Sequence, residues 1–265
     1  MRVLLTGSLG SIGRVVERGL TDLGHAVLGV DIAAGAAYQV DCTDPVAVDT
    51  MVAGARPDAV VHLAGNPSEA SLPESLASHS LTTAALLDAM VHHGVGRIAF
   101  ASSNHAVGRI PAFDAGIPVG VGVHAQPRPD TFYGVAKVTA EALLSLYADR
   151  YGVDAISCRI GSFLEKPTSR RNLATWLSHG DAVRMVEAAI TTPSTGYAVL
   201  YGISANTRAW WDLEAGHRLG YHPVDDAEDW AAEIEQQPET EADRAEAAHV
   251  GGPFATPEFE RPAFD

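Results

Sequence analysis

Tyr133 and Lys137 are residues whose types and spacing could do acid–base chemistry. A separation of four residues places both side chains on one face of a helix. A lysine ammonium near a phenol favours the phenolate, so we expect Lys137 to lower the pKa of Tyr133 and make it a usable base. Because Tyr-x-x-x-Lys is common on helix surfaces, its meaning depends on the motifs that precede it.

Ser102 and Ser103 end the apolar segment RIAFASS, which has the pattern of a buried strand. A hydroxyl at that strand end could hold the reacting oxygen of a substrate. Because side chains alternate along a strand, we expect Ser103 to face the site and keep Ser102 as the alternative. A cap of a turn or helix is the purely structural interpretation of either serine.

Gly7, Gly10 and Gly13 separate the first apolar segment from an amphipathic one. In this strand–turn–helix context the spacing is typical of a dinucleotide site. Gly7 permits the tight turn, Gly10 lets the backbone approach a pyrophosphate, and Gly13 lets the helix pack closely on the strand. Ser11 and Ile12 begin that helix, whose amide groups are expected to face the phosphates.

Asp31 closes the second apolar segment, about 24 residues after Gly7, where an acid binds the ribose hydroxyls and repels a 2′-phosphate. Ile32 stands where an arginine would favour NADP, so the sequence predicts NAD. Asp41 and Cys42 follow the third apolar segment and are expected near the adenine, although Asp41 could equally be a turn acid. The other expected cofactor contacts follow the fourth segment and are Leu63, Ala64, Gly65 and Asn66.

Strand-like and helix-like segments alternate through the first 160 residues. Strands are predicted at 3–6, 26–30, 38–40, 59–63, 97–102 and 155–160, and helices at 11–23, 45–54, 73–93 and 131–151. This alternation predicts an α/β fold with a doubly wound parallel sheet of the Rossmann type and ligands at the carboxyl ends of its strands.

The alternation of strand-like and helix-like segments becomes less regular after Ile160. Helices are expected at 175–179 and 181–190, a strand at 198–203 and one solvated helix within 225–247. The last fifteen residues, GGPFATPEFERPAFD, hold three prolines and three phenylalanines; the prolines are common in disordered tails, but the phenylalanines predict docking on the body or on a neighbouring subunit. We therefore expect a single domain over 1–265, in which residues from about 161 onward form a small C-terminal substrate lobe.

The charge balance excludes several classes of partner. With 18 Lys and Arg against 33 Asp and Glu, the formal net charge is −15. This charge argues against binding to nucleic acid or anionic lipid. No apolar run is long enough to cross a bilayer, and Cys42 and Cys158 are too few for a disulfide framework. We expect a cytoplasmic protein without a metal site, in which the two cysteines are buried.

The TGxxGxxG turn, Asp31, Ser103 and the YGVAK segment together resemble the extended short-chain dehydrogenase/reductase superfamily. Further motifs resemble the uronate dehydrogenase family: SSNH with Gly108, RPDTFYGVAK, RIGS, Arg171 before LATW, the Ser178–His179 pair, and YGISAN with WWD. This likeness runs from residue 1 to about 230.

The resemblance implies NAD-dependent oxidation of galacturonate or glucuronate at C1 to the aldarolactone. It makes Tyr133 the general base, has Lys137 hold the nicotinamide ribose and has Ser103 polarise the substrate oxygen. Arg171 would bind the C6 carboxylate, and Ser162 would lie near both ligands. The other substrate contacts that it implies are Asn104 and His105.

The sequence also departs from the family pattern. Pro67 stands where the family has a substrate-binding serine, so Ser68 is the nearest candidate. His79 stands where many relatives have an asparagine in a proton relay, and a structural role is the other interpretation. Arg170 lies beside Arg171, so the sequence does not decide which of the two arginines binds the carboxylate.

Two other functions stay open at this point. A sugar-nucleotide epimerase or reductase of the same superfamily usually has a larger C-terminal lobe than the roughly 100 residues that follow Ile160 here. A non-catalytic NAD sensor is the other alternative, although such proteins often lose the tyrosine or the lysine. We expect a homo-oligomer, because helices beside the site commonly form dimers in such folds.

Overall fold

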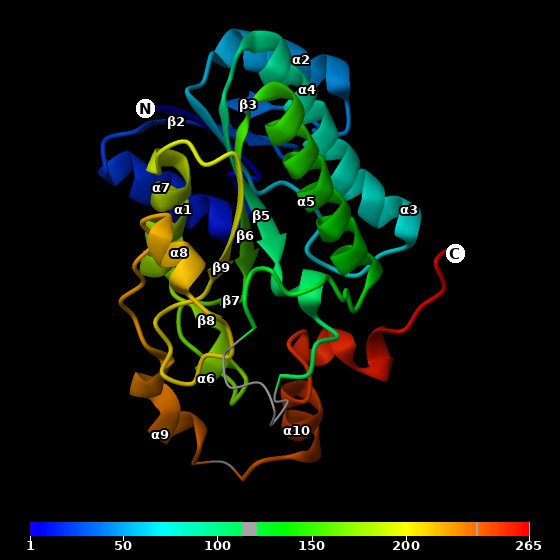
Figure 1. The fold of residues 1–265 in the computed structure, drawn as a ribbon, viewed down its shortest axis with the longest axis vertical. Helices are drawn as coiled ribbons and strands as arrows, with labels where there is room; N and C mark the ends of the chain where they lie inside the picture. Colours follow the sequence, from blue (N-terminus) through cyan, green and yellow to red (C-terminus); the bar gives the residue numbers. More distant parts are fainter. Residues whose placement is uncertain (113–120, 237, 265) are drawn as a thin grey trace.

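A parallel sheet of seven strands forms the centre of the molecule (Figure 1). The computed structural model describes residues 1–112, 121–236 and 238–264. In spatial order the strands are β3 (Tyr38–Gln39), β2 (Ala26–Asp31), β1 (Arg2–Thr6), β4 (Ala59–His62), β5 (Arg97–Ser103), β6 (Asp154–Ile160) and β9 (Tyr197–Gly202). Every neighbouring pair is parallel. The predicted Rossmann-type sheet is confirmed.

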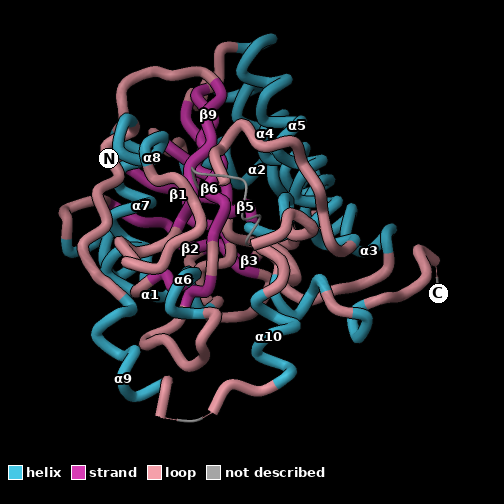
Figure 2. Tube along the Cα trace, turned by 60° about the horizontal axis from the view of Figure 1, so that its bottom comes forward, coloured by secondary structure: helices cyan, strands magenta, loops and turns pink. Residues whose placement is uncertain are grey.

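Helices cover both faces of this sheet (Figures 1 and 2). On one face α1 (Ser11–Asp22) packs against α7 (His179–Thr191), and their apolar side chains form one core with β1, β4 and β6. The second core lies on the other face, beneath α2 (Pro45–Ala55), α4 (Thr82–His93) and α5 (Phe132–Tyr151). Parallel strands that are covered on both sides are apolar throughout, which explains segments such as AVVH in β4.

The helix expected at 73–93 is divided into three parts. It begins as α3 (Leu72–Ser75), continues as a π-helical turn at Leu76–Leu81 and ends as α4. The turn places His79 and Ser80 in the interior, where the Ser80 hydroxyl donates to the carbonyl of Ala136 on α5 at 3.1 Å. π-Turns of this kind are frequent at functional sites.

The segment expected as a helix at 175–179 was predicted wrongly. A short helix, α6 (Asn172–Thr175), stops there, and β8 (Trp176–Leu177) runs in parallel beside β7 (Ser162–Phe163). Ser178 then caps α7, since its hydroxyl accepts a hydrogen bond from the amide of Asp181 at 2.9 Å. A cap of this kind requires extended backbone at Ser178, which ends any helix before it.

The rest of the chain wraps the carboxyl edge of the sheet. After α8 (Glu214–Arg218), the acidic stretch forms a 3-10 turn (Ala227–Trp230), α9 (Ala231–Ile234) and α10 (Glu241–Ala247) rather than one helix. The predicted docking of the tail on the body is confirmed: 3-10 turns at Gly252–Ala255 and Pro257–Phe259 lie below the end of β5 and beside the start of α5 (Figure 1). Within the described ranges, no helix is both long and apolar enough to span a membrane.

Candidate functional site

A cleft of about 840 Å³ opens along the carboxyl ends of β1, β2 and β4. Gly7 adopts a left-handed φ of +70°. A Cβ on Gly13 would lie 2.1 Å from the carbonyl oxygen of Gly7, so glycine is required there for the close packing of α1. Ser11 and Ile12 form the first turn of α1. The predicted cofactor residues that line the cleft are Gly7, Gly10, Asp31, Ile32, Asp41, Cys42, Leu63, Ala64, Gly65 and Asn66.

Asp31 lies at the end of β2 with its carboxylate on this cleft. One oxygen accepts from the amide of Leu9 in the glycine turn at 2.9 Å, and the other accepts from the amide of Ala33 at 3.0 Å. These bonds fix the carboxylate at the edge of the cleft. The arrangement fits a dinucleotide, because the volume, the glycine cradle and the acid are all present in one cleft.

Asp41 also behaves as a turn acid, the alternative that its position in the sequence left open. Its carboxylate accepts from the amide and hydroxyl of Thr43 at 2.9 and 2.7 Å, and these bonds lower its pKa. Arg14, which sequence analysis missed, brings a cation to the same cleft and donates to the carbonyl of Leu9 at 2.9 Å.

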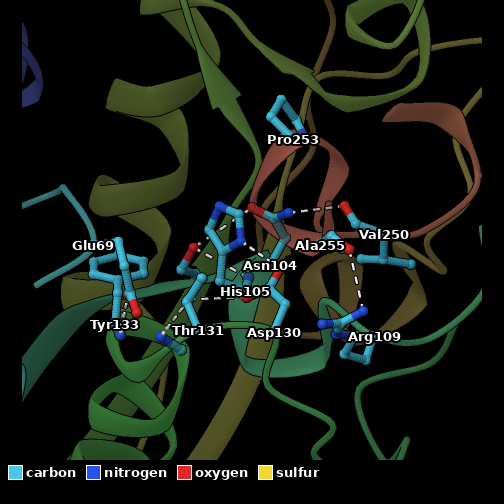
Figure 3. A network of polar contacts seen from close by, with 12 residues as sticks. Glu69, Asn104, His105, Arg109, Asp130, Thr131, Tyr133, Val250, Pro253 and Ala255 are labelled. Carbon is cyan, nitrogen blue, oxygen red and sulfur yellow. Dashed lines mark hydrogen bonds and ion pairs between the residues drawn. The ribbon is translucent and has the colours of Figure 1, made fainter. Parts of the chain in front are cut away.

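Tyr133 lies in the first turn of α5, and two acceptors hold that turn in place. Thr131 caps the helix by accepting from the amide of Gly134 at 3.1 Å. Glu69 reaches across from the loop after β4, where its two oxygens accept from the amides of Phe132 and Tyr133, each at 3.0 Å (Figure 3). A carboxylate is favourable at a helix N-terminus. Glu69 therefore ties the loop that follows β4 to the backbone of the turn that carries Tyr133.

Burial controls the protonation of the Tyr133–Lys137 pair. It raises the pKa of Tyr133 to about 12, against a smaller opposite effect of the hydrogen bond with Ser103. It also lowers the pKa of Lys137 to about 7, while Glu141 opposes that change. The expected lowering of the Tyr133 pKa by Lys137 is therefore wrong for the free protein, because burial disfavours both charged forms.

Lys137 is oriented toward the sheet. Its ammonium donates to the carbonyl of Ala101 on β5 at 2.6 Å and lies 5.4 Å from the centre of the Tyr133 ring. It also stands 4.9 Å from the centre of the Phe100 ring. These contacts place the lysine beneath the tyrosine, as the four-residue spacing on α5 predicts.

The two serines at the end of β5 have different partners on α5. Ser103 interacts with Tyr133. Ser102 instead donates to Glu141 at 2.6 Å, and Glu141 forms a buried ion pair with Arg159 at 2.8 Å. Of the two, Ser103 is the one that lies at the site.

Asn104, Ser162 and Arg171 meet at the tail. The carbonyl of Val250 accepts from the side chain of Asn104 at 3.0 Å and from the guanidinium of Arg171 at 2.7 Å. Arg171 also donates to the hydroxyls of Ser162 and Thr175 at 3.2 and 3.4 Å. The structure thus brings together substrate residues predicted from distant parts of the sequence.

Arg170 and Arg171 have different surroundings. Arg170 pairs with the exposed Glu235 at 3.4 Å. Arg171 is directed into the protein, where burial lowers its pKa to about 10 and its Nε has no hydrogen-bond partner in the part of the chain that the structure describes. Of the two arginines, Arg171 is therefore the one whose guanidinium lies beside Ser162 and Asn104 rather than on an exposed acid.

Ser68 and His79 lie on the other side of Tyr133. Ser68 is exposed and lines a small pocket with Asn66 and His79. The His79 ring contacts the Tyr133 ring edge-on, with 5.0 Å between centroids, and its Nε2 lies 2.8 Å from the carbonyl of Asn66. Burial lowers the pKa of His79 to about 3, so its ring is neutral at physiological pH.

Sequence analysis assigned no role in the site to three residues: Glu69, Asp130 and Phe254. Phe254 stacks on the ring of His105 at a centroid distance of 4.4 Å and approaches Tyr133 at 6.4 Å. The three phenylalanines of the tail indicated docking, but nothing indicated where it would occur. Figure 3 shows His105 and Asn104 between the turn that carries Tyr133 and the tail.

A possible metal-binding group lies apart from this site, where α2 faces the end of α4. Asp49, His92 and His93 have ligand atoms within 4.8 Å of one another. Both rings are hydrogen-bonded to the same carboxylate oxygen, at 2.8 and 2.9 Å. These bonds explain the cluster without an ion.

Comparison with known proteins places the chain in a family. Residues 3–178 match the model of the NAD dependent epimerase/dehydratase family. The uronate dehydrogenase of Pseudomonas putida is 37% identical, over 96% of this chain and 95% of that protein. The chain belongs to the uronate dehydrogenase family. The predicted family and its NAD dependence are thereby confirmed.

Two further relatives bear on the site of this uronate dehydrogenase family member. A crystal structure of a mutant uronate dehydrogenase from Agrobacterium tumefaciens, complexed with NAD, has a TM-score of 0.88 at 34% identity and covers 99% of this chain and 98% of that one. The NAD-dependent glucose-6-phosphate dehydrogenase of Haloferax volcanii is 31% identical over 88% of this chain and 97% of that protein. These related enzymes are named for different sugars. The substrate of this chain must therefore be inferred from its own candidate substrate-binding residues.

Proposed function

We propose that this protein oxidises a hexuronic acid, D-galacturonate or D-glucuronate, at C1 to the aldarolactone with NAD as the acceptor. The observation that carries the substrate class is the Arg171 guanidinium. Its Nε is buried, and the described hydrogen-bond partners of the guanidinium are two hydroxyls and a carbonyl rather than a carboxylate. Glu246 and Asp130 act on this cation only through their charge, and a buried cation without a hydrogen-bonded anion is costly. A planar carboxylate matches the guanidinium fork. The C6 carboxylate of a uronate would supply this anion.

The residues would act as follows. Ser103 holds the C1 oxygen, and Tyr133 removes its proton. Lys137 orients the nicotinamide ribose, and Asp31 holds the adenosine ribose. Bound NAD supplies the hydride acceptor. Because C1 of the pyranose already carries the ring oxygen, loss of the proton and hydride gives the lactone directly.

A panel of sugars tests this function. NADH absorbance would be followed with galacturonate, glucuronate, galactose and glucose 6-phosphate under the same conditions. We expect rapid NADH formation with at least one uronate and little with galactose. A strong preference for glucose 6-phosphate or galactose would reject the proposal. Tight binding of a UDP-sugar without NADH formation would favour an epimerase.

Asp31→Ser is expected to change the cofactor preference. The substitution removes charge-assisted hydrogen bonds to the ribose, so kcat/KM for NAD should fall by at least about tenfold. Without the Asp31 carboxylate, the 2′-phosphate of NADP is no longer repelled, so NADP should become usable. Adding Ile32→Arg to the same chain should increase kcat/KM for NADP further. Initial rates with each cofactor measure this, with Asp22→Asn as a surface control. An unchanged preference would contradict the role of Asp31.

The rate should increase with pH, because a general base must lose its proton to act. For a tyrosine whose pKa is raised toward 12, the deprotonated fraction grows tenfold per pH unit below that value. We therefore expect kcat/KM to keep rising from pH 6 to 9, with circular dichroism confirming an intact fold throughout. A plateau that begins below pH 7 would show that the pKa of the base is low in the working enzyme.

The assembly and the compartment are part of the same proposal. We expect a homo-oligomer in the cytoplasm, with residues from about 161 onward acting as the substrate lobe of one domain. Light scattering measures the oligomeric state directly.

A further inference from the structure

His105 and Asp130 form a hydrogen-bonded pair beside Tyr133 (Figure 3). The two side chains meet at 2.8 Å, between Nδ1 and Oδ2, and the Asp130 side chain is completely inaccessible to solvent. We propose that Asp130 is a positioning residue that holds His105 in the tautomer whose Nε2 accepts a hydrogen bond from a substrate hydroxyl. This inference rests on the proposed sugar-acid substrate.

The carboxylate of Asp130 packs against two glycines that leave room for it because they have no Cβ. A Cβ on Gly108 would lie 1.9 Å from Oδ2, and a Cβ on Gly251 would lie 1.7 Å from the same atom. Neither glycine has a positive φ, so backbone conformation does not explain them. The two glycines come from segments about 140 residues apart and are joined by the hydrogen bond from the amide of Gly251 to the carbonyl of Gly108 at 2.9 Å. They allow a carboxylate to be buried between the body and the tail.

The second oxygen of Asp130 is tied to the catalytic helix. The hydroxyl of Thr131 donates to Oδ1 at 3.0 Å, and the same hydroxyl accepts from the amide of Gly134. Asp130 is therefore fixed relative to the turn that carries Tyr133. A substitution of Asp130 would therefore change the position or the protonation of His105 beside Tyr133.

The ring of His105 is fixed on two further sides. Phe254 stacks on it with an interplanar angle of 26°, and the Tyr133 ring lies edge-on at a centroid distance of 5.7 Å. Only 16% of the His105 side chain is exposed. With its plane set by these rings and one nitrogen bonded to Asp130, the ring has a single orientation available.

The bond to Asp130 decides which ring nitrogen carries the proton. A carboxylate only accepts hydrogen bonds, so Nδ1 of His105 must be the donor. In a neutral imidazole, Nε2 is then an acceptor. In the described part of the chain, Asp130 is the hydrogen-bond partner of this ring. Nε2 is thus left to accept from a hydroxyl of the sugar, while Arg171 takes the carboxylate.

Nitrogen NMR of the wild-type protein tests the tautomer directly. Histidine labelled with ¹⁵N in the ring gives distinct shifts for protonated and unprotonated nitrogens, and His105→Gln identifies the signals of His105. At pH 7.5 we expect a protonated Nδ1 and an unprotonated Nε2. A protonated Nε2, in either the other tautomer or the imidazolium, would overturn the inference. This readout does not need activity, so it stands apart from failure of the proposed function in the sugar panel.

A double-mutant cycle tests whether Asp130 acts through His105. Asp130→Asn allows the amide to donate to Nδ1 and releases the tautomer. It should lower kcat/KM for the uronate about a hundredfold, while the Kd for NAD stays unchanged. In the His105→Ala background, the same change should cost less than about twofold. An equal loss in both backgrounds would overturn the inference, since the charge of Asp130 also influences Tyr133 and Arg171.

Discussion

Tyr133→Phe is expected to reduce kcat for uronate oxidation by about a thousandfold, within the range found for loss of a general base. The change removes one oxygen atom and leaves the ring contacts with His79, His105 and Phe254 available. The NAD cleft lies along β1, β2 and β4, so the Kd for NAD should not change. Steady-state kinetics and a fluorescence titration with NADH measure the two quantities.

Tyr147→Phe is the matched control on the same helix. The Tyr147 hydroxyl donates to Asp88 on α4, and neither residue lines the cleft. Its loss should leave kcat within about twofold and at most lower the melting temperature slightly. A Tyr133→Phe enzyme with near-wild-type turnover would remove Tyr133 from the reaction.

Arg171→Ala is expected to lower kcat/KM for galacturonate by about a hundredfold or more, the usual cost of removing one partner of a buried charge pair. Activity with galactose, which lacks the carboxylate, should change little. The selectivity for acid over neutral sugar should therefore collapse. Parallel measurement of kcat/KM for both sugars gives this ratio, and Arg171→Lys should recover only part of it because an ammonium lacks the bidentate fork.

Arg170→Ala controls for loss of positive charge in the same segment. Arg170 pairs with an exposed glutamate, so its removal should leave the selectivity ratio intact. If both alanine variants lose galacturonate activity equally, the effect reflects local folding. If Arg171→Ala lowers galactose and galacturonate activity alike, Arg171 does not read the carboxylate.

Most of the sheet could be predicted because each strand and helix carries its own pattern. The Asp44 cap of α2 and the Gly24 turn after α1 are local signals of this kind. The π-turn at Leu76–Leu81 was missed because its cause is tertiary: Ser80 bonds to α5, and His79 packs against Tyr133. β8 was missed because it is too short to show a period, and its partner β7 precedes it by 14 residues.

The residues of the site also fall into those with a local sequence pattern and those placed by tertiary contacts. The glycine turn, Asp31 and the Tyr133–Lys137 pair are recognisable because their spacing within one element sets their geometry. Glu69, Asp130 and Phe254 have no such spacing, and their roles arise from contacts that cross between 25 and about 150 residues of chain. The pKa of Tyr133 shows the same limit, since a neighbouring lysine is visible in sequence while burial is not.

The site depends on the tail, so the thermal stability of the sheet and the thermal stability of the site can differ. Val250 belongs to a small apolar cluster with Val107 and Trp211, separate from the two large cores on the faces of the sheet. Its carbonyl nevertheless orients both Asn104 and Arg171. Engineering that improves the large cores would raise the temperature at which the sheet melts without necessarily extending the temperature range of catalysis. Work toward a heat-tolerant catalyst should therefore begin at the Val250 cluster and be scored by residual turnover rather than by melting temperature.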